Sequence, residues 1–226
     1  MDNIAVWILF LIVGFSIVIA AYKFFGPTGL YALIAMTIVI ANIQVMKLIE
    51  MFGIALTLGN ILYGTIFLST DILSEFHGKK AARKAVWIGL FALIASTIYM
   101  QITLLYTPAA DDFVHEHLAA IFGFFPRIVL ASIIAYVISQ HLDIWLYTTL
   151  KEKFKGRHLW LRNNLSTMTS QFVDSLLFAT IAFYGVFSWD IFIQIVITTY
   201  IIKFVVAGLD TPFMYLVKRW IAKKTY

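Results

Sequence analysis

Two acidic residues stand at the end of a long apolar run, a place where charge is costly. Asp71 and Glu75 are one helical turn apart, so both carboxylates lie on the same side of a helix. Four cations follow directly in the segment 79–84. Burying a charge at membrane depth costs free energy, so acids are rare there. An acid at this depth is therefore a candidate functional residue.

Comparable polar faces occur on four apolar segments in all. In each segment, residues spaced three or four apart share one helical face. The first two faces are Asn60, Tyr63, Phe67, Asp71 and Ser74, then Ser132, Tyr136, Gln140, Asp143 and Tyr147. The other two are Thr167, Gln171, Asp174, Phe178 and Ala182, then Tyr200, Lys203, Ala207 and Asp210. Lys203 lies near the middle of its segment, and we expect it to pair with Asp174.

A cavity built from such faces suits a flat, hydrogen-bonding heterocycle. A carboxylate can accept adjacent N–H groups of a guanine-like edge, and an amide can serve the neighbouring carbonyl. Aromatic faces can stack on the ring, which contributes about 1–3 kcal/mol per base in nucleic-acid binders. A substrate with a cationic amine would also find a carboxylate partner.

Two plainer interpretations stay open. Acids near helix ends, such as Asp143 and Asp210, can be interfacial anchors, and polar side chains also hold helices together without any ligand.

A short echo, Ser-Gln-x-x-Asp, occurs at 139–143 and again at 170–174. It is too short to establish an inverted repeat of the kind common in transporters.

Composition favours a polytopic membrane protein. The chain of 226 residues is 62% hydrophobic and only 13% charged, whereas soluble domains carry about 25% charged residues. Its mean hydropathy is +0.89. We therefore expect an all-α integral membrane protein in contact with lipid, a single domain over 1–226. Seven spans are expected at 4–24, 28–49, 54–75, 85–106, 120–149, 165–187 and 190–217.

Loop charge predicts the orientation. Cations gather at 23, 79–84, 151–162 and 218–224, whereas 107–118 and 188–190 carry acids and no Lys or Arg. The positive-inside rule then places the N-terminus outside and the C-terminus inside. The first segment has Asp2 and no cation before its apolar run, so we interpret it as an uncleaved helix. The net charge of +5 reflects topology, and no nucleic-acid partner is expected.

Catalytic and metal-site motifs are lacking in the sequence. Neither Gly-x-Ser-x-Gly nor His-Glu-x-x-His occurs, and the five histidines fall in expected loops or near helix ends. The chain has no cysteine, which excludes disulfides and thiolate metal sites. We expect no enzyme activity, no metal and no cofactor.

The chain resembles the queuosine precursor transporter family, which is grouped with vitamin uptake transporters. The resemblance covers 28–220 and leaves 1–27 as an additional N-terminal helix on a six-helix core. The matching motifs are Ala41-Asn42 with Lys47, Thr70-Asp71-Ile72-Leu73-Ser74-Glu75 with Gly78 and Arg83, Ser139-Gln140-x-x-Asp143, the run from Trp160 to Thr167, Ser170-Gln171-x-x-Asp174, and Tyr200-x-x-Lys203 leading to Asp210-Thr211-Pro212.

The resemblance implies import of the 7-deazaguanine bases preQ0 and preQ1 across the bacterial cytoplasmic (inner) membrane. It implies these substrate or gating residues: Asn42, Asp71, Glu75, Gln140, Asp143, Gln171, Asp174 and Lys203. Tyr63, Phe67 and Phe178 are the expected stacking residues. The alternatives are a substrate-binding subunit of an ATP-driven uptake complex, an intramembrane hydrolase or an assembly protein. A homo-oligomer and the mode of energy coupling stay open.

Overall fold

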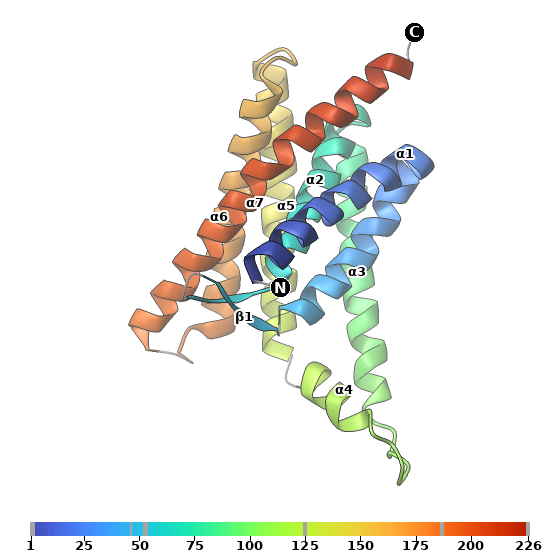
Figure 1. Ribbon diagram of the computed structural model, residues 1–226, viewed down its shortest axis with the longest axis vertical. Helices are drawn as coiled ribbons and strands as arrows, with labels where there is room; N and C mark the ends of the chain where they lie inside the picture. The colour runs from blue at the N-terminus through green and yellow to red at the C-terminus, as the bar shows by residue number, and fades with distance from the viewer. Residues whose placement is uncertain (1–2, 46, 52–53, 124–125, 186–187, 225–226) are drawn as a thin grey trace.

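The computed structural model describes residues 3–45, 47–51, 54–123, 126–185 and 188–224, and it is a helical bundle with one short hairpin (Figure 1). In chain order, the elements are α1 (Asn3–Gln44), β1 (Leu48–Met51), β2 (Ile54–Thr57), α2 (Gly59–Phe76), α3 (Lys79–Thr103), α4 (His115–Phe122), α5 (Pro126–Lys153), α6 (Leu159–Phe183) and α7 (Trp189–Lys224). The predicted helical architecture is confirmed.

The helix α1 consists of two helices joined at a sharp break. Gly26 has φ 59° and ψ −145°, and Pro27 follows it inside the helix. Glycine adopts a positive φ without steric cost, and proline suits the first turn of the helix that follows. The predicted division between the segments 4–24 and 28–49 is therefore confirmed.

The predicted helix ends around residue 50 are wrong. The second half of α1 stops at Gln44, and β1 pairs antiparallel with β2 in the register Leu48↔Thr57. The segments 28–49 and 54–75 were expected to be helical through these positions. A hairpin can replace the helix ends because its two strands satisfy each other's backbone groups.

Two further boundaries differ from the prediction. The segment expected at 120–149 is divided, since α4 ends at Phe122 and α5 begins at Pro126, a residue suited to a first helical turn. The basic run 79–84, expected in a loop, forms the first turns of α3. Cations can extend a helix beyond the apolar region because their charged ends reach water.

The helix α2 is the centre of the bundle. It contacts α1, α3, α5 and α7, and 15 of its 18 residues are buried. Gly64 permits the close approach of α7, because a Cβ added there would lie 2.3 Å from Cγ1 of Val206. Small residues allow such tight packing between helices in a membrane.

Among the described residues, four helices are long and apolar enough to cross a membrane: α1, α3, most of α5 and the segment Val196–Trp220 of α7. The helix α6 carries many polar residues, which pack against α5 and α7. The α2–α3 turn, the α5–α6 turn and the C-terminus lie toward one end, the top of Figure 1, while the hairpin, α4 and the α6–α7 turn lie toward the other. Basic connections therefore gather at a single end.

Candidate functional site

The polar faces expected on four separate segments converge in the interior. On α2 and α5, every residue of the predicted faces is buried, with no more than 8% of its surface exposed. On α6 and α7, Phe178 and Tyr200 are half-buried and the other predicted face residues are buried. The residues spaced three and four apart therefore lie on the inward side of each helix, as predicted.

The expected pair of Asp174 and Lys203 is present and joins α6 to α7. Nζ of Lys203 donates to Oδ2 of Asp174, and both side chains are almost fully buried. Ser139 of α5 donates a second hydrogen bond to Asp174, with 2.9 Å between Oγ and Oδ1. The Lys203 ammonium also lies 5.0 Å from the ring centre of Tyr63, which brings α2 into the same contact set.

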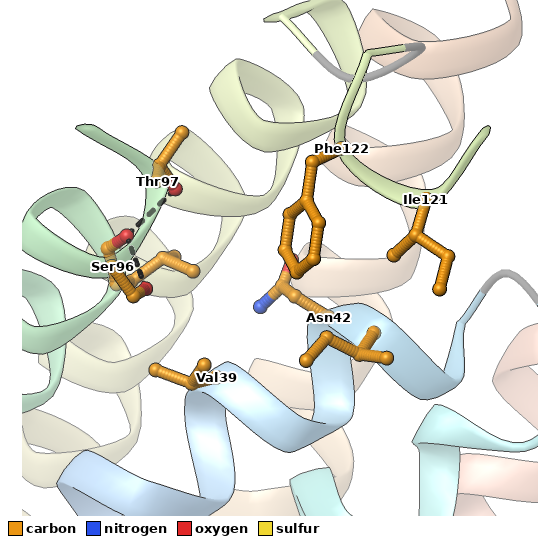
Figure 2. A pocket seen from close by; sticks show the side chains of 8 residues that line it. Val39, Asn42, Ser96, Thr97, Ile121 and Phe122 are labelled. Carbon is orange, nitrogen blue, oxygen red and sulfur yellow. Dashed lines mark hydrogen bonds between the residues drawn. The ribbon is translucent and has the colours of Figure 1, made fainter. Parts of the chain in front are cut away.

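Asn42 extends this set to α1. Its Nδ2 donates to the carbonyl of Ile38 at 2.8 Å and to the hydroxyl of Tyr63 at 3.4 Å. Asn42 also lines a small pocket of about 30 Å³ between α1, α3 and α4, where Phe122 approaches it (Figure 2). One water needs about 10–15 Å³ on this measure, so the pocket in this state is too small for a base.

A group of three carboxyls lies deeper in the bundle and comes from three helices. Asp71, Asp143 and Asp210 have no exposed surface, and Asp71 lies within hydrogen-bonding reach of Asp143. Each acid accepts one hydrogen bond from α6: from Thr167 at 3.1 Å to Asp71, from Ser170 at 2.9 Å to Asp143, and from Asn163 at 2.6 Å to Asp210. The full burial of Asp143 and Asp210 disagrees with the alternative that these acids are interfacial anchors.

Glu75 belongs to an ion-pair cluster near the basic end. Nη2 of Arg162 lies 2.5 Å from one carboxylate oxygen, and Nζ of Lys151 lies 3.1 Å from the other. The hydroxyl of Tyr147 donates to Glu75 at 3.3 Å. The cluster joins α2, α5 and α6, and Glu75 is already well supplied with donors in this state.

Two buried amides keep unused hydrogen-bonding groups. Oε1 of Gln140 accepts from Thr70 at 3.2 Å. Within the part of the chain that the structure describes, Nε2 of Gln140 and both amide atoms of Gln171 have no hydrogen-bond partner. A buried polar group left unpaired costs about 1–3 kcal/mol, so these amides are suited to a polar ligand.

The aromatic residues are placed less uniformly. Phe67 is fully buried in α2, close in sequence to Thr70 and Asp71. Phe178 is half-buried on α6 and meets Phe183 edge to face, with 5.7 Å between ring centres. Within the described residues, Tyr63 is the expected stacking residue that contacts the polar set, through Asn42 and Lys203.

Sequence reasoning missed several contributors. Arg162 was counted among loop cations, yet it is fully buried within α6 and pairs with Glu75. Asn163, Thr167 and the two serines of the repeated Ser-Gln-x-x-Asp echo were not proposed as site residues. The run of amides and hydroxyls from Arg162 to Ser170 was the available signal, because so polar a stretch can enter a membrane only on an inward face.

Comparison with known proteins agrees with the earlier resemblance. Residues 57–217 match the profile of a family described as "Putative vitamin uptake transporter". A probable queuosine precursor transporter of Bacillus subtilis is 45% identical over 222 residues, covering 98% of this chain and 97% of the relative. The queuosine precursor transporter of Escherichia coli is 30% identical over 164 residues, covering 72% of this chain and 70% of the relative.

No solved structure matches the chain. The family profile spans most of the sequence and includes all four polar helices. The match to the Bacillus subtilis relative also includes the first half of α1. The chain therefore belongs to the vitamin uptake transporter family that includes the queuosine precursor transporters, and it is a membrane transporter rather than an enzyme.

Proposed function

We propose that this protein imports queuosine precursors, the 7-deazaguanine bases preQ0 and preQ1, across the bacterial cytoplasmic membrane. The observation that carries the proposal is the near full-length similarity to a queuosine precursor transporter. The buried carboxylates and the unpartnered amides of Gln140 and Gln171 agree with it, since such a base offers N–H donors and a carbonyl acceptor in one plane.

The proposed topology has seven spans with the N-terminus outside and the C-terminus inside. The helix α1 crosses twice, on either side of Gly26, and α2, α3, α5, α6 and α7 cross once each. The gathering of basic connections at one end supports this orientation by the positive-inside rule. Residues 1–27 then form a helix added to a family core at 28–220.

The proposed binding residues divide along the bundle. Asp174 and Gln171 accept and donate at one edge of the base, with Asn42 and Tyr63 on the route from α4. Asp71, Asp143 and Gln140 offer the next polar position, while Phe67 and Phe178 provide apolar ring contacts. Lys203 is the counter-ion of Asp174 while the site is empty. Glu75 acts as a gate, since its present partners Arg162 and Lys151 must separate before a base can pass.

The test is uptake of radiolabelled preQ0 or preQ1 by the purified chain alone in liposomes. We expect saturable uptake by the wild type and a loss of at least tenfold in the Asp174→Asn variant. Asp111→Asn, in the exposed connection before α4, is the matched control and should transport normally. Wild-type liposomes that take up neither base would contradict the proposal and would favour a subunit that needs an ATPase partner.

The same variants can be compared in cells. A strain unable to make or import queuosine precursors should regain queuosine in its tRNA when it expresses the wild type and receives low external preQ0 or preQ1. Restoration by Asp174→Asn equal to that by the wild type would exclude Asp174 from the binding site, although not the transport function.

A further inference from the structure

The helices α5 and α6 exchange hydrogen bonds in a reciprocal manner. The echo Ser-Gln-x-x-Asp supplies Ser139 and Asp143 on α5, and Ser170 and Asp174 on α6. Ser139 donates to Asp174 at 2.9 Å, and Ser170 donates to Asp143 at 2.9 Å. In both contacts, the serine of one copy of the echo donates to the aspartate of the other copy. The echo is therefore a structural repeat at this point.

The two halves of this repeat differ in their third partner. On one side, Lys203 of α7 places an ammonium against Asp174. On the other side, Asp71 of α2 approaches Asp143, so the third partner of this acid is a carboxyl and not a cation. Asp174 thus has a proton-bearing neighbour, whereas Asp143 faces a second acid.

No cation compensates this second acid pair among the residues that the structure describes. The ionisable groups that interact electrostatically with the pair are Asp210 on α7 and Tyr147 on α5. The buried cations Lys203 and Arg162 are engaged elsewhere, with Asp174 and Glu75 respectively. Asp210 is a third acid whose charge acts on both carboxyls. The negative charges of Asp71 and Asp143 must therefore be compensated by a positive species other than a side chain, such as a proton.

A neighbouring amide indicates that the position accepts a ligand. Gln140 lies one turn from Asp143 on the same face of α5, and Thr70, adjacent to Asp71, donates to its Oε1. Its Nε2 is buried without a hydrogen-bond partner in the described chain. Oδ1 of Asp71 and Oδ2 of Asp143 likewise receive no hydrogen bond of ordinary geometry there. Two acceptors and one donor are thus available around the pair.

We propose that Asp71 and Asp143 share one exchangeable proton and that its passage drives import. An O–H bond forms on one carboxyl when a proton arrives from the outside, and it breaks when the proton leaves to the cytoplasm. The shared proton lies between the two carboxyls and reduces their repulsion. It thus has the role that the Lys203 ammonium has beside Asp174. This inference rests on the proposed transport function and adds its driving force.

The first experiment measures gradient-driven uptake in liposomes that contain the purified chain. With an acidic exterior, we expect accumulation of preQ1 or preQ0 severalfold above the level without a gradient, and its loss on addition of a protonophore. Uptake that proceeds equally well with and without the gradient would overturn the proton inference while leaving the transport function intact. No uptake under any condition would instead refute the transport function.

The second experiment detects the proton itself and does not depend on transport. Infrared difference spectra of the wild-type protein in H₂O and D₂O should contain the band of a protonated carboxyl, which shifts on deuteration. Asp143→Asn should abolish the band, whereas Asp111→Asn in the exposed connection should retain it. A wild-type spectrum without that band across the range from mildly acidic to neutral pH would refute the shared proton, whether or not the variants fold.

Discussion

Neutralising one member of the buried pair Asp174–Lys203 should destabilise the protein far more than neutralising both. Asp174→Asn keeps an oxygen for the hydrogen bond from Ser139 but leaves the ammonium of Lys203, which is 3% exposed, without its counter-ion. Lys203→Met leaves a buried carboxylate with Ser139 alone. Breaking a buried pair on one side costs about 3–5 kcal/mol.

The double variant Asp174→Asn with Lys203→Met tests the origin of that cost. Replacing both charges of a buried pair is often neutral or stabilising, so we expect most of the loss to be recovered. The expected coupling energy is above about 2 kcal/mol, whereas interhelical hydrogen bonds in a membrane protein average only about 0.6 kcal/mol in comparable cycles. The contact of Lys203 with Tyr63 adds about 0.5–2 kcal/mol to the loss caused by the lysine variant.

The assay is reversible unfolding in mixed micelles, followed by the fluorescence of the six tryptophans. Each single variant should unfold at a clearly lower denaturant fraction, and the double variant should return close to the wild type. Additive losses in the double variant, or single variants as stable as the wild type, would refute the argument that this ion pair is a desolvated contact. Ser139→Ala, which removes one hydroxyl and no charge, serves as the control for general disturbance of the α5–α6 contact.

Two other predictions concern packing and topology. Gly64→Leu should abolish assembly of the folded bundle, because even a Cβ at this position would lie 2.3 Å from Cγ1 of Val206. Size-exclusion chromatography of the detergent-solubilised variant should then show loss of the monodisperse peak. The natural absence of cysteine allows topology mapping without background. Lys80→Cys should be protected from an impermeant maleimide in intact cells while Asp111→Cys reacts, and the reverse pattern would contradict the proposed orientation.

The helices of the bundle were predictable from sequence where the residues of one segment determine its local structure. The division between the segments 4–24 and 28–49 was predicted, and Gly26 and Pro27 explain it because both residues act locally on the backbone. The hairpin 48–57 was not, since a short apolar run cannot be assigned to strand or helix by periodicity alone. The same limit applies to α4 (His115–Phe122), because its first residues were assigned to the acidic connection 107–118 and its last three to the segment 120–149.

The inward faces were predictable but their pairings were only partly so. Helical spacing placed Asp71, Asp143 and Asp174 on buried faces, because polar groups avoid lipid whatever they contact. Asp174 and Lys203 could be paired because their charges are opposite. The pairing of Arg162 with Glu75 could not be foreseen, because it depends on how α2 and α5 bring Glu75 and Tyr147 to the start of α6.

The polar contacts along α2 have a consequence for how a base can cross. From Tyr63 to Glu75 the helix rises about 18 Å at 1.5 Å per residue, more than half of a hydrocarbon core of about 30 Å. At one end Phe122 narrows the pocket beside Asn42, and at the other Arg162 holds Glu75. We therefore expect passage to need separate opening events at the two ends. Breaking the ion pair between Arg162 and Glu75 should favour opening of the bundle at the cytoplasmic end. The residues near Asn42 should keep their arrangement, because they lie on the opposite side of Asp174 and Lys203.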